Sequence, residues 1–189
     1  MEPLQDTQLI EKYLKGDEQS LEILIQRYFK LVYSFVIRSL GNKEEAEDLT
    51  QEIFLKVWNN LKKFNPEKSF KTWIFTIAKN TLIDYFRKKK IYTVSSVVND
   101  EGEEVDILDT IANQDLSALE NIEQQEIKSE LEKNLLKLSA DDRMLLLFYY
   151  EQRMNFREIA EMLEEPVDTV KSRHRRALIK LRKFLANIK

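Results

Sequence analysis

The apolar residues of this chain recur with the period of an α-helix along most of its length. Between residues 21 and 36 they return every three or four positions, which places them on one helical face. The same spacing predicts a helix over about 43–62, and another that runs from its N-cap Ser69 to about Lys90. Gly and Pro, which break helices, number three each. The fold class is therefore predicted to be all-α. The inward side chains of the helix over 43–62 are expected to be Ala46, Leu49, Ile53, Val57 and Leu61.

Polar residues and glycines mark the ends of the predicted helices. A short first helix is expected from Asp6, acting as its N-cap, to Gly16 at its C-terminal end. On the second helix, Leu31 is expected to belong to the buried face. On the helix that follows Ser69, we expect Trp73 to be core or half-buried and Phe75 to be less constrained.

Residues 93–117 interrupt the helical period. They lie in an acidic stretch, because residues 93–140 hold 3 basic against 12 acidic side chains, a net charge of −9. We interpret residues 93–117 as a flexible acidic linker that separates two small helical domains, at residues 1–92 and 118–189. Residues 1–92 and residues 141–189 each carry a net charge of +3. The overall net charge of −3 therefore does not argue against DNA binding, which depends on where charge clusters.

The last third of the chain has the signals of a helix-turn-helix. Ser139 and Asn155 each begin a capping box, and Pro166 suits the first turn of the last helix. In the preceding turn, Glu164 and Glu165 stand where a Gly is usual. A left-handed residue other than Gly costs on the order of 1 kcal/mol there. A helix-turn-helix of this kind lays its second helix in the major groove of DNA.

The last helix carries cations on the arc opposite its apolar residues. Arg can read guanine in a bidentate way, which is worth ~1–3 kcal/mol of discrimination. Lys, Ser and a helix N-terminus suit phosphates. His174 falls on the inner or boundary arc, where a packed histidine is favoured over a base reader. The residues predicted to contact DNA are Thr169, Lys171, Ser172, Arg173, Arg175 and Arg176.

The composition argues against most other kinds of site. The chain has no Cys and a single His, so we expect no disulfide, no thiolate site and no His-rich metal centre. No apolar run approaches the roughly 20 residues of a membrane span, and no secretory leader is visible at Met1. We therefore expect a cytoplasmic protein without membrane insertion. No Gly-rich phosphate loop or nucleophile–base pair points to an enzyme, a cofactor or a small-molecule substrate.

Two segments together resemble a known family. The segment Asp48–Trp58, followed by Phe64 and by Ser69–Lys89, is similar to regions 2.2 to 2.4 of bacterial sigma factors. The final helix-turn-helix, with its sequence Thr-Val-Lys-Ser-Arg from Thr169, resembles region 4.2. Nothing resembles region 3 or region 1.1, which matches the extracytoplasmic-function group. The resemblance implies a transcription initiation factor that binds core RNA polymerase and directs it to promoters through −35 and −10 elements.

The resemblance also implies a role for each segment. The helix from Asp48 would dock on the coiled coil of the polymerase β′ clamp, although Phe54 and Trp58 could simply pack as a helical pair. The loop from Phe64 to Ser69 would capture a flipped base of the −10 element and stabilise the melted strand. The residues that the resemblance assigns to polymerase binding are Asp48, Gln51, Glu52, Phe54 and Lys56. Those that it assigns to the −10 element are Phe64, Ser69, Trp73, Asn80, Arg87 and Lys88.

In the family, −35 contacts fall on positions that correspond to Lys171, Ser172, Arg173, Arg175 and Arg176. His174 and Arg175 depart from the usual pattern, in which an apolar residue precedes an aromatic residue or His. The linker of this family threads through polymerase channels that later carry RNA. The acidic residues here would therefore imitate a polyanion or serve only as a solvated tether. The resemblance further implies an anti-sigma factor as a regulator.

Two other classes of protein fit parts of the sequence. A stand-alone DNA-binding regulator would use only the C-terminal motif, and would usually bind palindromes as a dimer. A helical scaffold or anti-sigma-like protein would not contact DNA at all. Salt dependence separates the second class from a DNA-binding protein, because six phosphate contacts predict a log–log slope near −5.

Overall fold

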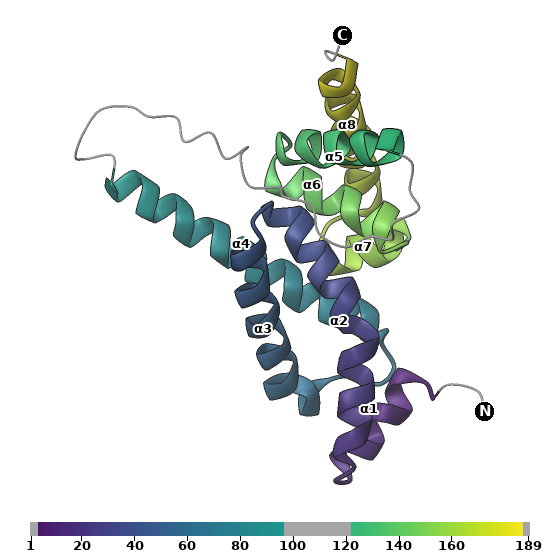
Figure 1. Cartoon of the computed structure of the whole chain (residues 1–189). Helices are drawn as coiled ribbons and strands as arrows, with labels where there is room; N and C mark the ends of the chain where they lie inside the picture. Colours follow the sequence, from purple (N-terminus) through teal and green to yellow (C-terminus); the bar gives the residue numbers. More distant parts are fainter. Residues whose placement is uncertain (1–3, 97–121, 187–189) are drawn as a thin grey trace.

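The computed structural model describes residues 4–96 and 122–186, and within these ranges the chain is helical with short turns and contains no strand. The all-α prediction is confirmed. Figure 1 shows α2 at the centre, with α1 near its N-terminal end and the C-terminal helices gathered at its other end. The N-terminal helices are α1 (Asp6–Leu14), α2 (Glu18–Leu40), α3 (Lys43–Asn60), the 3-10 turn η1 (Leu61–Lys63) and α4 (Phe70–Ser96). The C-terminal helices are α5 (Ile122–Leu136), α6 (Ala140–Leu146), the π-helical turn η3 (Leu147–Glu151), α7 (Phe156–Leu163) and α8 (Val167–Ala186).

Helix α4 is longer than its sequence pattern indicates. It continues to Ser96, so residues 93–96 are helical, and the prediction that the linker begins at residue 93 is wrong there. Loss of the apolar period does not exclude a helix, because backbone hydrogen bonds hold a helix whatever its side chains are. Residues 97–117 of the predicted linker lie outside the described residues.

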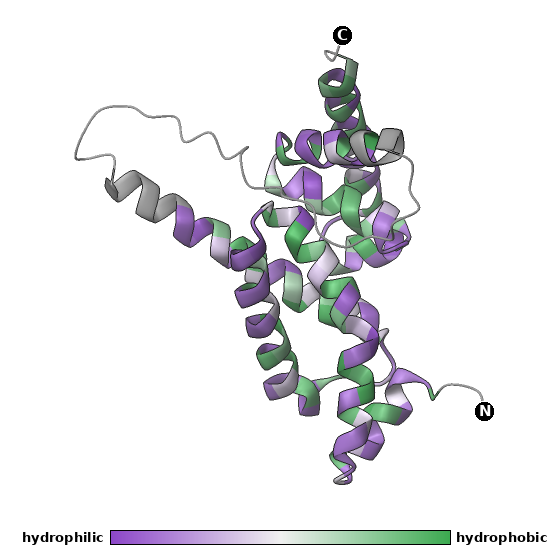
Figure 2. Cartoon of the chain, viewed as in Figure 1, coloured by the Kyte–Doolittle hydropathy of each residue, from purple (hydrophilic) through white to green (hydrophobic). Residues whose placement is uncertain are grey.

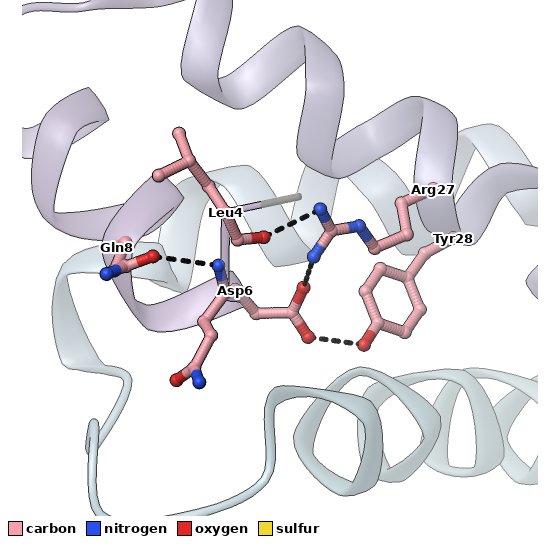
Figure 3. Close-up of polar contacts among 6 residues, drawn as sticks. Leu4, Asp6, Gln8, Arg27 and Tyr28 are labelled. Carbon is pink, nitrogen blue, oxygen red and sulfur yellow. Dashed lines mark hydrogen bonds and ion pairs between the residues drawn. The ribbon is translucent and has the colours of Figure 1, made fainter. Parts of the chain in front are cut away.

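The first helix is capped by a residue other than the expected one. Gln5 is its N-cap and forms a reciprocal capping box with Gln8. The prediction that Asp6 caps this helix is wrong, because the Asp6 carboxylate turns toward α2 instead. There it makes an ion pair with Arg27 and accepts a 2.5 Å hydrogen bond from the Tyr28 hydroxyl (Figure 3). This pair of contacts ties the N-terminal segment to α2.

Helices α2, α3 and α4 enclose a core of aliphatic and aromatic side chains. All five predicted inward positions are buried, four of them on α3 and Leu61 in η1. On α2, Leu24, Val32 and Phe35 are buried as expected, but Leu31 is 39% exposed. Its assignment to the buried face is wrong. A spacing of three or four residues locates an apolar stripe, but it does not show how much of the stripe's width is covered by neighbours.

The C-terminal helices begin where the polar residues indicated. The Ser139 side chain accepts a hydrogen bond from the Asp142 amide at 3.3 Å, at the start of α6. Asn155 and Glu158 form a complete capping box at the start of α7. The chain reverses after α7 at Glu164, whose left-handed backbone (φ 56°, ψ 36°) serves where a Gly is usual. The fold therefore tolerates the local cost of that conformation.

The N-terminal and C-terminal helices share one apolar core (Figure 2). Phe148 of η3 stacks on Phe35 of α2 at a ring-centroid distance of 4.7 Å and meets Phe75 of α4 edge-on at 6.2 Å. All three rings are fully buried. The expectation that Phe75 is less constrained is wrong, because the side of α4 that carries it is covered by a segment more than 70 positions later in the chain.

Two lysine side chains of α4 lie at the edge of this shared core. Lys71 donates a hydrogen bond to the main-chain carbonyl of Gln152, and Lys79 donates one to that of Met162 at 2.9 Å. Burial lowers the pKa of both ammonium groups. Because carbonyl oxygens satisfy these donors, the C-terminal helices bind α4 through polar as well as apolar contacts.

Two ion pairs also join the N-terminal helices to the C-terminal helices. Arg38 lies 3.5 Å from Glu151, which also accepts a hydrogen bond from Ser34. Lys68 lies 2.6 Å from Glu161, but both of these side chains are about 60% exposed. An exposed pair of this kind contributes little to stability, so the Arg38–Glu151 contact is the more important one.

Candidate nucleic-acid and polymerase interfaces

Helix α8 has one buried face and one exposed cationic face. Val170, His174, Ala177 and Leu181 form its buried row. His174 is 9% exposed, which confirms the expectation that it is packed. Five of the six residues predicted to contact the −35 element are exposed, namely Thr169, Lys171, Ser172, Arg175 and Arg176. An amphipathic helix that presents cations and hydroxyls on its free side can enter a major groove.

The sixth residue, Arg173, lies apart from the exposed set. It is partly buried and its guanidinium pairs with the Glu165 carboxylate in the turn before α8. The structure therefore gives Arg173 a partner within the helix-turn-helix. At the other end of the helix, Lys180 pairs with the largely buried Asp142 of α6 at 2.7 Å. These two pairs fix α8 against the elements behind it.

The predicted −10 residues divide between the surface and a packed cluster. Ser69 caps α4 by accepting a hydrogen bond from the Thr72 amide at 3.3 Å. Asn80, Arg87 and Lys88 are exposed, and Arg87 pairs with Asp84 at 2.9 Å. These polar groups lie along one side of α4, which suits contact with a nucleic-acid strand.

Phe64 and Trp73 belong to an aromatic cluster beneath this surface. Phe64 is only 9% exposed and meets Trp73 edge-on at 5.4 Å and Phe70 at 5.5 Å. Trp73 is partly buried, as expected. In this conformation Phe64 supports the Trp73 ring from below and does not offer a free face of its own.

A surface pocket of about 490 Å³ opens beside the loop that precedes α4. The Asp6–Arg27 pair of Figure 3 forms part of its wall. Lys68, Ser69 and Phe70 contribute the loop side of the lining. The pocket is lined by charged and hydroxyl groups beside the buried Phe70 ring, and such polar groups can contact a nucleic-acid backbone.

The polymerase-facing residues predicted on α3 lie mostly at its surface. Asp48, Gln51 and Glu52 are exposed. Lys56 is partly buried; it pairs with Glu52 at 2.7 Å and donates a 3.1 Å hydrogen bond to Thr81 of α4. Lys56 and Glu52 are therefore paired with each other, whereas Asp48 and Gln51 lie exposed beside them.

Apolar residues accompany this face. Phe54, which was predicted to bind polymerase, is partly buried, whereas Phe29 and Leu55 were not singled out from the sequence. Leu55 is 55% exposed and Trp58 is 51% exposed. Phe29 of α2, 48% exposed, stacks on Phe54 at 5.8 Å, and Trp58 donates a 2.7 Å hydrogen bond to the Tyr13 hydroxyl. We call Phe29, Phe54, Leu55 and Trp58 the α2–α3 apolar face. Leu55 and Trp58 fall outside the inward spacing of α3, and that was the signal available from the sequence.

Comparison with known proteins assigns the chain to a family. A model of Sigma-70 region 2 matches residues 24–91, and a model of Sigma-70 region 4 matches residues 135–183. The chain is also 32% identical over 181 residues to ECF RNA polymerase sigma factor SigW of Bacillus subtilis (strain 168), an alignment that spans 95% of this chain and 96% of that protein. This chain belongs to the extracytoplasmic-function group of RNA polymerase sigma factors.

Other sigma factors support the assignment. ECF RNA polymerase sigma-E factor of Escherichia coli (strain K12) is 29% identical over 180 residues, which span 93% of this chain and 92% of that protein. The fold is similar to that of the sigma factor RpoE from Bartonella quintana, solved with the anti-sigma factor NepR, at a TM-score of 0.72 and 21% identity. That match covers 90% of this chain and 99% of the other.

The family fixes the general function. A sigma factor is a transcription initiation factor that recognises promoters, and it is not an enzyme. In this sigma factor, region 2 (residues 24–91) includes most of α2, all of α3 and most of α4, while region 4 (residues 135–183) includes the helix-turn-helix of α7 and α8. Among the helices within residues 4–96 and 122–186, none combines the length and apolar character that crossing a bilayer requires.

Proposed function

We propose that α8 of this sigma factor enters the major groove of the −35 element. The observation that carries this proposal is the division of α8 into a buried row and an exposed row that holds Thr169, Lys171, Ser172, Arg175 and Arg176. Arg175 and Arg176 would read base edges, while Lys171 and Ser172 would contact phosphates. Arg173 would act indirectly, by holding the turn through Glu165.

The −10 element would bind along α4 and the loop before it. The pocket beside Ser69 would receive a base turned out of the melted strand, and Asn80 would supply hydrogen bonds to a base edge. Arg87 and Lys88 would neutralise phosphates farther along the strand. Phe64 would act by supporting Trp73, in accord with its burial.

Core RNA polymerase would bind the outer side of α3 through its β′ clamp coiled coil. Asp48, Gln51 and Glu52 would provide the polar part of this surface. Phe54 and the rest of the α2–α3 apolar face would provide the buried centre, because interfaces concentrate their binding energy in such aromatic and aliphatic groups. Lys56 would position Glu52 through their ion pair.

Promoter use would require regions 2 and 4 to separate. In the structure they share the Phe35–Phe148 stack and the lysine contacts of α4. One molecule reading −35 and −10 elements, centred about 25 base pairs or about 85 Å apart along the duplex, needs a greater distance between its two reading helices. Binding to polymerase would favour the separated arrangement.

We also propose a cytoplasmic location, where promoter DNA and polymerase are found, and regulation by an anti-sigma factor, as family membership implies. No cofactor enters the proposed mechanism. The function rests on this chain's helices and on the nucleic acid and polymerase that they bind.

A run-off transcription assay with core polymerase and a promoter library tests the proposal. The addition of this sigma factor should create start sites that share −35 and −10 sequences. The Arg176→Ala variant should lower use of those promoters by about 5- to 150-fold, the effect of one lost bidentate contact, while polymerase binding persists.

Lys12→Ala is a control, because Lys12 is also an exposed cation but lies on α1, away from the helix-turn-helix. It should leave promoter choice unchanged. Start sites that do not depend on the sigma factor would refute the initiation role. Loss of polymerase binding in Arg176→Ala would refute the assignment of α8 to the −35 element.

A further inference from the structure

His174 is the only histidine of the chain, and it is the one ionisable side chain in the buried row of α8. Its neighbours in that row are Val170, Ala177 and Leu181. These three are apolar and match the aliphatic interior of a helix-turn-helix. The imidazole is therefore an unusual choice at the point where the recognition helix rests on the rest of region 4.

Three aromatic rings surround this imidazole. Tyr149 lies at a centroid distance of 4.7 Å, Phe156 meets it edge-on at 5.2 Å, and Tyr150 stacks on it at 5.5 Å. Tyr149 and Phe156 themselves stack at 4.7 Å. Tyr150 is 57% exposed and forms the outer wall, so the ring lies between the solvent side of η3 and the interior.

The surroundings favour the neutral form of the ring. Its Nε2 atom is buried and has no hydrogen-bond partner among the described residues. Burial lowers the pKa of His174 below its usual range. A charged imidazole in this place would lose hydration without gaining an anionic partner, which is an unfavourable exchange.

The charged groups on η3, α7 and α8 do not reverse this preference, and on α6, which also packs against α8, Asp142 pairs with Lys180. The ionisable groups in ring contact on η3 are the phenols of Tyr149 and Tyr150, and the next residue of η3, Glu151, pairs with Arg38. On α8 the flanking residues are both cations, Arg173 and Arg175. On α7, Phe156 is followed by Arg157 and Glu158, and the Glu158 carboxylate accepts a hydrogen bond from the Asn155 amide.

We propose that His174 is a positioning residue of the recognition helix, and that its protonation weakens binding to the −35 element. This inference rests on the proposed −35 role of α8. The neutral ring holds the helix at one angle, with Arg175 and Arg176 directed outward. The protonated ring favours leaving the aromatic site, which tilts or loosens α8 and displaces groups that must meet base edges within fractions of an ångström.

The sign of the effect follows from linkage. Folding lowers the pKa of His174. The neutral ring therefore makes its full contribution to the free energy of helix docking above the ordinary histidine pKa of about 6.5. This contribution to docking is lost as the pH falls from about 6.5 toward the pKa that His174 has in the folded protein. Affinity for the −35 element should decline over the same window, by at most the factor that the pKa difference defines, which is tenfold per unit.

The first measurement is an NMR titration of the intact chain. Since there is one histidine, its ring C–H signals need no assignment by mutation. The expected pKa lies below 6.5, and Tyr150→Ser, which opens the outer wall to water, should raise it toward that value. A pKa at or above the ordinary value in the unmodified chain would overturn the proposal.

The second measurement compares the unmodified holoenzyme with His174→Leu, an apolar replacement that suits the aromatic site and does not titrate. Affinity is measured at several pH values for a promoter with the −35 element selected by the library assay, and for one with that element scrambled. The difference between the two promoters isolates the −35 contribution from pH effects on polymerase.

At pH 7.5 both proteins should show the same difference in affinity between the two promoters. As the pH falls below 6.5, that difference should shrink only in the unmodified protein. An equal decline in His174→Leu would overturn the role of His174. If neither protein distinguishes the two promoters at pH 7.5, the proposed −35 role of α8 fails, and this inference fails with it.

Discussion

The Phe35 ring of region 2 and the Phe148 ring of region 4 stack 4.7 Å apart, and neither is accessible to solvent. This contact joins residues 113 positions apart in the sequence. In this conformation the two regions therefore share one buried core.

Phe148→Ala should separate the stabilities of the two regions. We expect a loss of about 3–5 kcal/mol, the usual result of truncating a buried aromatic ring. Both tryptophans, Trp58 and Trp73, lie in region 2, so tryptophan fluorescence reports that region while circular dichroism reports all helices. Urea transitions by the two probes should coincide in the unmodified protein and diverge in the variant.

Phe148→Leu is the appropriate comparison for this experiment. It keeps most of the apolar volume, so it should lower stability less and leave the two transitions close together. Coincident transitions in Phe148→Ala would contradict the view that this ring couples the regions.

Gly41→Ala should also act through the contact between the two regions. Gly41 ends α2 with a left-handed backbone (φ 76°), and an added Cβ would lie 2.7 Å from the Leu136 side chain of α5. We expect the free energy of unfolding to fall by about 1–2 kcal/mol because of backbone strain. The clash with Leu136 should lower it further. Gly16→Ala is the comparison that measures the loss from backbone strain alone, because the added Cβ would meet no atom within 4 Å.

The measurement is the urea midpoint of both glycine variants with and without Leu136→Ala. The second substitution should recover part of the loss in Gly41→Ala and none in Gly16→Ala, as a double-mutant cycle would show. Equal losses in the two glycine variants would mean that Leu136 moves aside without cost.

Asp6→Asn should loosen the attachment of α1. The carboxylate serves both Arg27 and Tyr28, and these contacts are only partly exposed, so we expect a loss of about 1–2 kcal/mol in chemical denaturation. Glu11→Gln is the control, because the Glu11–Lys15 pair is about two-thirds exposed and should change stability little. A similar loss in both variants would refute a special role for Asp6.

The same variant should change the alkaline behaviour of Tyr28. Burial, and then the Asp6 carboxylate, raise the pKa of the Tyr28 phenol. The neutral phenol therefore makes its full contribution to the free energy of unfolding below its ordinary pKa of about 10. That contribution is lost as the pH rises above this value. In Asp6→Asn the pKa of Tyr28 should fall, which an ultraviolet titration of tyrosine ionisation would detect.

Leu55→Asp should weaken binding to core polymerase by about tenfold or more, because it places a charge in the centre of the α2–α3 apolar face. Folding should be unaffected, since Leu55 is more than half exposed. Ile23→Asp, at an exposed position on α2, should leave the affinity unchanged. An equal effect of both substitutions in a fluorescence-anisotropy titration would contradict the assignment of this face.

The sequence was sufficient to predict what depends on neighbours within one helix. The inward positions of α3, the capping box of α7 and the packed state of His174 are all confirmed. Each of these follows from spacing or from local hydrogen bonding. For the same reason, the exposed side of α8 could be identified before the structure.

The wrong predictions concern contacts between distant segments. Phe75 is buried because η3 covers it, and Asp6 leaves its capping position because Arg27 and Tyr28 offer stronger partners. The α4 continuation to Ser96 was missed because residues 93–96 carry no apolar period from which a helix could be predicted. None of these features has a signal in the local pattern.

The end of α4 at Ser96 and the start of α5 at Ile122 are joined by 26 peptide steps. A fully extended chain of that length reaches about 90 Å. Such a reach is comparable to the axial distance between two sites on B-DNA that are two and a half helical turns apart, about 85 Å. The covalent connection is thus long enough for one polypeptide to keep hold of both sites at once without unwinding either helix.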